Sequence, residues 1–222
     1  KIEMKEKLIG RHQEQKILKQ ALSSTFAELV AVTGRRRVGK TYLVKKTYAS
    51  NLKFVMTGIQ NGTLEEQLQH FANSLNLQFQ PDVPFKKADN WLNAFHELSM
   101  FLQKKNYKKK YVLFFDEMPW MATRRSGFVK AFGAFWNSWA AQQHLVIVIC
   151  GSAVYWIIQK IVRDKGGLHN RITKRIQLMP FTLAETKDFL ISQNINLTHY
   201  QIIQLYMAMG GIPHYLKEIV KG

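Results

Sequence analysis

The sequence contains a single cysteine, Cys150, and so lacks the pair that an internal disulfide requires. A secreted, disulfide-stapled scaffold is therefore excluded, and a reducing compartment is the expected setting. No apolar run approaches the roughly 20 residues that a membrane-spanning helix needs, and no signal-peptide pattern opens the chain. These absences predict a soluble, cytoplasmic protein with no membrane partner.

Acidic residues are also scarce, with 15 Asp and Glu against 32 Lys and Arg, which gives a formal net charge of +17. Such an excess favours polyanionic partners, namely nucleotides, nucleic acid or the acidic face of another protein. With 46% hydrophobic residues among 222, the chain can bury a sizeable core. It begins at Lys1 and stops after a helical pattern, so we expect it to be part of a longer protein.

Apolar, β-branched and aromatic runs without polar alternation predict buried strands. Four such runs and a weaker fifth are Glu28–Thr33, Lys53–Thr57, Tyr111–Phe115, Leu145–Cys150 and Thr173–Leu178. Apolar residues at helical spacing fill the intervals between them. Strands that alternate with helices indicate crossover connections, so the predicted fold is α/β, with a parallel five-stranded sheet flanked by helices.

After Pro180 the pattern becomes entirely helical, with expected helices over Leu183–Gln193, Thr198–Met209 and Pro213–Val220. We therefore expect an α/β core over residues 1–179 and a small helical domain over residues 180–222. No repeat or low-complexity tract interrupts either part.

A phosphate-binding motif follows the first predicted strand. Gly34–Thr41 matches G-x-x-x-x-G-K-[ST] in full, and a helix is expected to begin near Lys40. Glycines allow the backbone to turn its N–H groups toward one centre at the positive end of a helix dipole. Lys40 is expected to reach the β- and γ-phosphates, and the Thr41 hydroxyl to ligate Mg²⁺.

Three consecutive arginines, Arg35, Arg36 and Arg37, lie inside this motif. They can supply further phosphate contacts or contact a neighbouring macromolecule. The interpretation favoured here is that they point to solvent from the rim of the loop, because backbone amides already serve the phosphates.

Polar residues end two other buried strands. Asp116 and Glu117 follow one of them, and in a parallel sheet they are expected beside the phosphates, with Asp116 in the Mg²⁺ shell and Glu117 activating the attacking water. Ser152 ends another, where it can bind the γ-phosphate or the water if that strand lies between the other two, or cap a following helix. Cys150 is expected in the core, and the histidines show no zinc-ligand spacing.

Further motifs occur in a fixed order around these segments: Ile9–Glu14, Gly167–Arg171, Pro180–Phe181 and Gly210–Leu216. Over essentially its whole length the chain resembles AAA+-related P-loop ATPases. The specific resemblance is to the family "ATPase domain predominantly from Archaea", near the signal-transduction ATPases with numerous domains. This resemblance implies a P-loop NTPase core with a C-terminal helical lid, and ATP or ADP with Mg²⁺ as ligands.

The resemblance also implies roles for individual residues. It places Ile9 and Arg11 beside the adenine and Pro213 of the lid against the base. The nucleotide-binding set that it implies is Ile9, Arg11, Gly34, Arg35, Arg36, Arg37, Val38, Gly39, Lys40, Thr41, Tyr42 and Pro213. Arg171 resembles an arginine finger that acts on a neighbour's nucleotide, which requires self-association; a solvated arginine is the alternative. Asn170 departs from the family pattern, which commonly has Gly there.

Lysine runs at Lys104–Lys105 and Lys108–Lys110 precede the strand that ends in Asp116, so they are expected opposite the nucleotide site. Arg124–Arg125, Lys160, Arg163 and Lys165 are expected nearer the ligand. Such charges can bind a DNA backbone, although a solvated face is the commoner outcome.

The sequence thus predicts a Mg²⁺-dependent ATPase that acts as a conformational switch. One alternative is a DNA-associated regulator that reads nucleotide state with little turnover. Another is a small-molecule phosphotransferase built on the same loop.

Overall fold

The computed structural model describes residues 8–105, 107–123, 125–152, 168 and 170–220. Its strands are β1 (Glu28–Gly34), β2 (Leu52–Thr57), β3 (Tyr111–Asp116), β4 (Leu145–Gly151) and β5 (Lys174–Leu178). Its helices up to β4 are α1 (His12–Ser23), α2 (Lys40–Thr47), α3 (Leu64–Phe79), α4 (Trp91–Lys105), α5 (Met118–Met121), α6 (Phe128–Ser138) and the 3₁₀ turn η1 (Ala140–Gln142). Helices α8 (Leu183–Ser192), α9 (His199–Met209) and α10 (Pro213–Leu216) follow β5.

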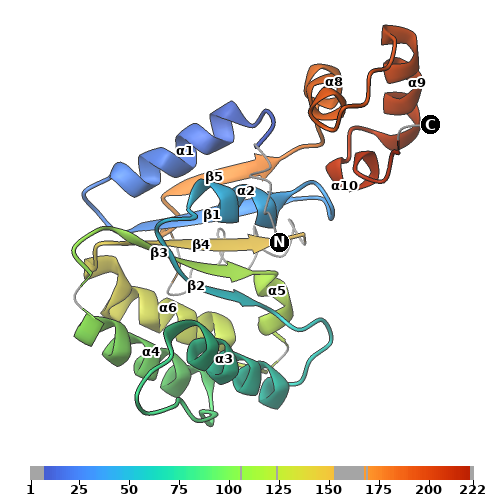
Figure 1. Ribbon diagram of the computed structural model, residues 1–222. Helices are drawn as coiled ribbons and strands as arrows, with labels where there is room; N and C mark the ends of the chain where they lie inside the picture. Colours follow the sequence, from blue (N-terminus) through green and yellow to red (C-terminus); the bar gives the residue numbers. More distant parts are fainter. Residues whose placement is uncertain (1–7, 106, 124, 153–167, 169, 221–222) are drawn as a thin grey trace.

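The five strands form one sheet in the order β2-β3-β4-β1-β5, and every neighbouring pair is parallel. All carboxyl ends therefore meet at one edge, which lies toward the helices after β5 (Figure 1). The predicted parallel sheet is confirmed, and the predicted strand ends differ from those observed by one residue. Strand β4 lies between β1 and β3, which brings the polar residues after all three strands together.

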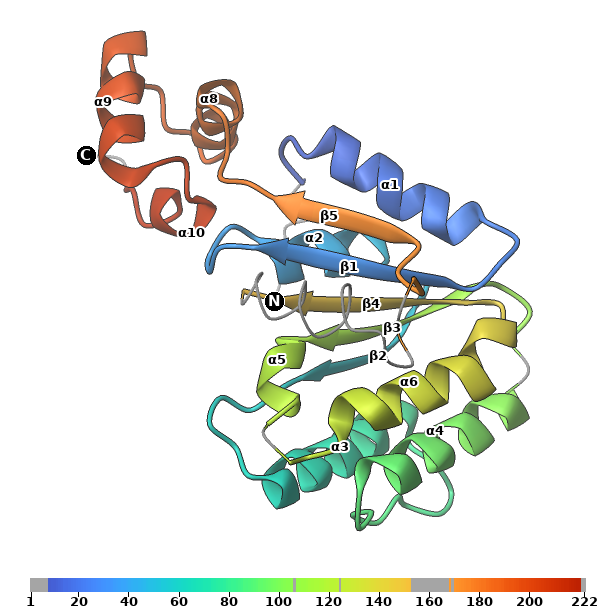
Figure 2. The ribbon, with the colours of Figure 1, turned by 180° about the vertical axis from the view of Figure 1, so that it is seen from behind.

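Helices cover both faces of the sheet, and the two faces differ in composition. Helices α3, α4 and α6 lie on one face, and α1 and α2 on the other (Figures 1 and 2). Alternation along β4 divides its side chains between them, with Ile147 in an aromatic-rich cluster and Val148 in a mainly aliphatic one. Both β3 and β4 are buried along their whole length, as central parallel strands require.

Local sequence signals explain where several helices begin. Thr63, Thr182 and Thr198 each cap a helix by accepting from the backbone N–H three residues on, where a Glu or Gln returns the hydrogen bond. In α4 the apolar residues at helical spacing form the buried face of the helix. Trp91, Phe95, Leu98 and Leu102 are at most 2% exposed. Helix α6 ends at Ser138, so Trp139 lies just beyond it.

The helices after β5, called the lid from here on, project from the carboxyl edge of the sheet beyond β5 (Figure 1). The predicted helix Pro213–Val220 is wrong in its extent, because α10 ends at Leu216. Beyond that point the amides of Glu218 and Ile219 bond carbonyls three residues back, which is the tighter pattern of a turn. None of the helices in the described ranges has both the length and the apolar character needed to cross a bilayer.

Candidate nucleotide site

The phosphate-binding motif forms the turn between β1 and α2. Gly34 has φ 151°, and a Cβ on it would lie 2.4 Å from the carbonyl oxygen of Leu178 on the neighbouring strand β5. Only glycine allows β1 to leave the sheet this close to β5. The turn then ends at Gly39, which precedes α2 in a left-handed conformation.

Helix α2 begins directly after the phosphate-binding turn, with its N-terminus at the end of that turn. No side chain caps the helix at Gly39, and no acidic residue lies in its first turn. The backbone N–H groups at a helix N-terminus and the helix dipole favour an anion. Phosphate binding at this turn stays a prediction.

The Lys40 side chain curls back over the turn. Its Nζ donates to the carbonyl oxygens of Gly34 at 3.0 Å and Arg35 at 2.8 Å, and the residue is 5% exposed. No carboxylate is paired with the ammonium in the described chain. A buried cation held only by carbonyl dipoles is a strong attractor for an anion.

Thr41 and Asp116 meet across the carboxyl edge of the sheet. The Thr41 hydroxyl donates to Oδ2 of Asp116 at 2.6 Å, and Oδ1 of Asp116 accepts from the Glu117 amide at 3.0 Å. Asp116 is only 4% exposed. A hydroxyl and a buried carboxylate are hard oxygen donors, so this pair fits Mg²⁺.

The side chain of Glu117 is held by Ser152, the residue that follows β4. The backbone of Glu117 is left-handed, with φ 46°, and its Oε2 accepts from the amide of Ser152 at 3.2 Å and from the Ser152 hydroxyl at 3.3 Å. The sequence predicted Ser152 on the γ-phosphate, the water or a helix cap. In the structure this hydroxyl donates to the carboxylate of Glu117, and its contact with a phosphate or a water stays a prediction. The helix that it was expected to cap falls in residues 153–167, outside the described chain.

Cys150 lies beneath these carboxylates in the aliphatic cluster. Burial, with a further contribution from Asp116, raises the pKa of its thiol well above the ordinary value. The thiol is therefore protonated and packs as a core side chain, as the sequence predicted.

A cavity of about 980 Å³ opens between the sheet edge and the lid. Residues of the motif line one side, Glu117 and Trp120 another, and the lid contributes Phe181, Phe189 and Pro213. Of the residues predicted for the nucleotide, those that line it are Ile9, Arg11, Arg36, Arg37, Val38, Gly39, Lys40, Thr41, Tyr42 and Pro213. The other predicted site residues of this region, Gly34, Arg35, Asp116 and Ser152, are not among those that line the cavity.

The three arginines of the turn are exposed, as favoured from the sequence, but two of them have partners there. The Arg36 guanidinium lies over the Trp120 ring at 5.5 Å. Arg37 donates to the Tyr215 hydroxyl at 3.1 Å, so the turn contacts the lid directly. Sequence reasoning missed both aromatic partners, since Trp120 and Tyr215 carry no local signal for such contacts.

Arg171 is exposed and does not line the cavity of its own chain. It lies three residues before β5 begins, at the end of that strand remote from the carboxyl edge. Its predicted role on a neighbour's nucleotide stays a prediction. Gly167 and His169 of the same motif lie outside the described residues.

The sequence also carried an unused signal for the lid. Thr182-Leu183-Ala184-Glu185 has the T-x-x-E spacing of a capping box, and Glu185 accepts a hydrogen bond from the Arg11 amide, outside its own helix, at 3.1 Å.

In the described residues no group of three or more His, Cys, Asp or Glu is arranged to hold a metal.

Comparisons with known proteins agree with this geometry. Residues 8–219 match the family described as "ATPase domain predominantly from Archaea". An uncharacterized protein of Methanocaldococcus jannaschii is 22% identical over 211 residues, which are 95% of this chain and 44% of that protein. The chain thus spans less than half of this curated relative.

Two solved structures share the fold. The Walker-type ATPase of Pyrococcus abyssi matches with a TM-score of 0.69 and 19% identity, over 96% of this chain and 66% of that one. The ORC2 protein of Aeropyrum pernix, in ADPNP and ADP complexes, matches with a TM-score of 0.63 and 14% identity, over 84% of this chain and 52% of that one. The phosphate-binding turn, the two carboxylates and the match over residues 8–219 together show that the chain belongs to the family of P-loop ATPase domains found predominantly in archaea.

Proposed function

We propose that the chain binds ATP in the cavity between core and lid and hydrolyses it with the help of Mg²⁺. The observation that carries the proposal is the convergence of Lys40, the Thr41–Asp116 pair and Glu117 at one edge of the sheet. The family supports ATP as the ligand, and the 980 Å³ cavity leaves room for a nucleotide.

Each residue then has a defined task. The α2 amides bind the phosphates, and the Lys40 ammonium exchanges its two carbonyl acceptors for phosphate oxygens. Thr41 and Asp116 would hold Mg²⁺, which when bound neutralises charge on the β- and γ-phosphates. Glu117 orients a water molecule and accepts its proton while the new O–P bond forms and the bond to the ADP oxygen breaks.

Lys40→Ala tests the binding site. We expect ADP and ATP affinity to fall by roughly 100-fold or more, since charge-assisted contacts to the phosphates are lost. Lys45→Ala is the matched control, because Lys45 is an exposed lysine at the other end of α2. Undiminished affinity in Lys40→Ala, measured by titration calorimetry, would contradict the assignment.

Glu117→Gln separates binding from hydrolysis. We expect nucleotide affinity within a few-fold of the wild type and turnover lower by about 10²- to 10⁴-fold, the range for loss of a general base. Ser152→Ala leaves the Glu117 carboxylate but removes one of its two hydrogen-bond donors, so turnover is expected to fall less than in Glu117→Gln. Wild-type turnover in Glu117→Gln would remove Glu117 from this role.

We further propose that hydrolysis involves two subunits and works as a switch. Arg171 would complete the site of a neighbour, and the Arg37–Tyr215 contact would let phosphate occupancy bias the lid. A mixture of Lys40→Ala and Arg171→Ala chains tests the first point, because only an arginine acting between subunits restores turnover. Turnover per chain that does not rise with protein concentration would argue against self-association.

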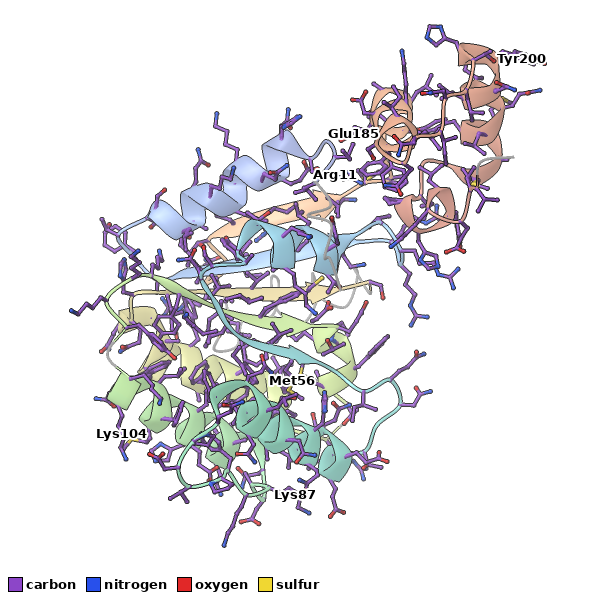
Figure 3. All side chains as sticks on the ribbon, in the orientation of Figure 1. Arg11, Met56, Lys87, Lys104, Glu185 and Tyr200 are labelled. Atoms are coloured by element: carbon purple, nitrogen blue, oxygen red, sulfur yellow. The ribbon has the colours of Figure 1, made fainter. Side chains whose placement is uncertain are left out.

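A second candidate function, nucleic-acid binding, is favoured by charge at the opposite edge of the sheet. Lys45 and Lys46 end α2, Lys104 and Lys105 end α4, and Lys53 lies 5.8 Å from the Tyr107 ring. The sequence has no Asp or Glu between Glu28 and Glu65 or between Glu97 and Asp116. In Figure 3, Lys104 lies at the end of the molecule remote from Arg11 and Glu185.

One lysine of this edge is unavailable, which corrects the sequence interpretation of Lys108–Lys110 as a single charged run. Lys110 is 5% exposed, and its Nζ donates to the carbonyl oxygens of Ala21, Ser24 and Phe26, where α1 ends. Burial lowers the pKa of this lysine. Lys110 therefore holds α1 in place and cannot contact a phosphate backbone.

Duplex DNA titrated at several salt concentrations tests this second function. Affinity is expected to fall steeply with salt, with a slope of about 0.9 per phosphate contact. A triple variant that replaces Lys104, Lys105 and Lys108 by glutamine should show a flatter slope. A control triple variant that replaces three exposed lysines elsewhere, Lys16, Lys86 and Lys130, by glutamine should keep the wild-type slope. A slope that is flat in the wild type, or equal in both variants, would leave the edge as a solvated surface.

A further inference from the structure

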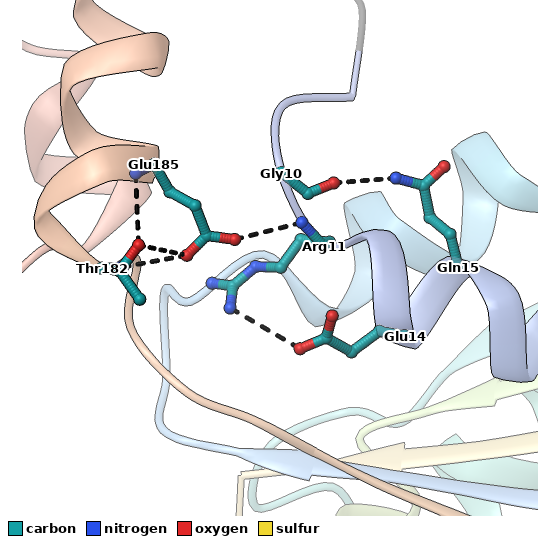
Figure 4. Close-up of polar contacts among 6 residues, drawn as sticks. All are labelled: Gly10, Arg11, Glu14, Gln15, Thr182 and Glu185. Carbon is teal, nitrogen blue, oxygen red and sulfur yellow. Dashed lines mark hydrogen bonds and ion pairs between the residues drawn. The ribbon is translucent and has the colours of Figure 1, made fainter.

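Glu185 joins the lid to the N-terminal segment of the core. Its Oε2 accepts from the amide of Thr182 at 2.9 Å and from the hydroxyl of Thr182 at 3.2 Å, which closes the cap of α8. Its Oε1 accepts from the Arg11 amide at 3.1 Å, across 174 positions of sequence (Figure 4). One carboxylate therefore binds both the first turn of the lid and the residue that precedes α1.

The lid holds Arg11 from a second side. The Arg11 guanidinium lies 4.6 Å from the centre of the Phe181 ring, at the start of the lid, and its Nη1 is 3.9 Å from Oε1 of Glu14. The residue is 5% exposed and its backbone is left-handed, with φ 58°. Both the main chain and the side chain of Arg11 thus depend on where the lid lies.

Arg11 also has an unused donor. Its Nη2 is buried without a hydrogen-bond partner, and the residue lines the cavity assigned to the nucleotide. An unsatisfied buried charged donor is costly, so a ligand acceptor there would be strongly favoured. Burial lowers the pKa of Arg11, and Glu185 and Glu14 oppose that effect, so both carboxylates stabilise the charged guanidinium.

The contact between Glu185 and the core leaves no spare room. A Cβ on Gly10, which has φ 61°, would lie 2.4 Å from Oε1 of Glu185. Gly10 also accepts from Gln15 Nε2 at 2.8 Å, which fixes the turn before α1 (Figure 4). The carboxylate therefore packs directly on the backbone that carries Arg11.

From this geometry we propose that Glu185 is a positioning residue that sets the place of Arg11 in the cavity and so couples nucleotide affinity to the position of the lid. The inference rests on the proposed nucleotide site. A ligand that engages the free Nη2 favours the Arg11 position that the lid holds, and by linkage the lid is held more firmly when the ligand is bound.

A double-mutant cycle on ADP affinity tests the coupling, with ADP and Mg²⁺ titrated by calorimetry. Glu185→Ala is expected to weaken ADP binding about tenfold, the effect of losing a charge-assisted contact. In an Arg11→Ala background the same change should cost less than about twofold, because no guanidinium remains to be positioned. Thr182→Ala is the matched control, since it removes the cap hydroxyl but leaves the Glu185–Arg11 contact, and it should change affinity less than about twofold.

Amide hydrogen exchange over α8 is the second readout. ADP should slow exchange there in the wild type and in Thr182→Ala, but not in Glu185→Ala. If Glu185→Ala does not fold, Glu185→Gln replaces it, because the amide keeps one acceptor oxygen for the cap.

The coupling would be overturned if Glu185→Ala left ADP affinity unchanged. It would also be overturned if Glu185→Ala still weakened ADP binding tenfold in the Arg11→Ala background, or if Thr182→Ala weakened ADP binding as much as Glu185→Ala does. A wild-type protein that binds no ADP would instead overturn the nucleotide site itself.

Discussion

The α/β core and the lid differ sharply in how they are held together. In the core, the Phe95 ring lies within 6.0 Å of six other aromatic rings on α3, α4, α6 and β3. In the described part of the lid, Leu190, Ile195 and Ile202 form a small buried cluster separate from those of the core. So small a cluster cannot fix the lid by itself, and its place depends on contacts with the core.

Those contacts are few and mostly polar in the described residues. Ile212 docks in the aliphatic cluster beside β5, the Arg11 guanidinium lies over the Phe181 ring, Arg37 donates to Tyr215, and Glu185 accepts from Arg11. Elements held this way belong to the low-stability end of a protein, from which moving parts are drawn. The core is therefore expected to act as a rigid platform and the lid as the moving part.

The largest effect should come from the aromatic cluster. Phe95→Ala is expected to lower the free energy of unfolding by about 3–5 kcal/mol, because it leaves a cavity among packed rings. Urea denaturation measures it. Leu77→Ala is the control, since Leu77 is 77% exposed on α3 and should change stability by less than about 0.5 kcal/mol. Equal effects would mean that the core is not tightly packed.

A cavity in the lid should act locally. Leu190→Ala is expected to destabilise the lid by about 2 kcal/mol or more, at the lower end for a buried leucine, while the core stays folded. Hydrogen exchange should then accelerate over α8 and α9 and stay unchanged over β3 and β4. Acceleration in the sheet as well would show that lid and core unfold as one unit.

A smaller effect is expected from the contact between the phosphate-binding turn and the lid. Tyr215→Phe removes the hydroxyl that accepts from Arg37 but keeps the ring, which lies 5.4 Å from the guanidinium. The substitution should lower the free energy of local unfolding of the lid by at most about 1 kcal/mol, because both side chains are exposed. Faster exchange over α10, with an unchanged urea midpoint, is the expected outcome; a shifted midpoint would contradict the division into platform and moving part.

The smallest effect should appear at low pH. Burial raises the pKa of Glu185, but the Thr182 and Arg11 amides and the Arg11 guanidinium outweigh it and hold the pKa below 4.5. The stability from this carboxylate is therefore present above pH 4.5 and is lost as pH falls through the lowered pKa. The difference in free energy of unfolding between the wild type and Glu185→Gln should therefore shrink as the pH is lowered through this range. A difference independent of pH would show that the charge of Glu185 is not involved.

Much of the sheet could be predicted because central parallel strands are buried on both faces. The continuous apolar runs that become β3 and β4 follow directly from that burial, and the turn from Gly34 to Thr41 has a full motif. The last helix was predicted too long, since its apolar spacing continues past the point where i→i+3 bonds end it. Lys110 was misjudged because a lysine among lysines gives no sign that its ammonium will be buried on the end of α1.

The amino-acid sequence by itself determined the strands, the helical spacing and the phosphate-binding turn, because each rests on neighbouring residues and a fixed period. The tertiary structure alone decided that β4 lies between β1 and β3, that Ser152 holds Glu117, and that Glu185 reaches Arg11. These contacts join residues far apart along the chain. Their partners are chosen by the order of strands in the sheet and by the docking of the lid, which no local pattern of residues encodes.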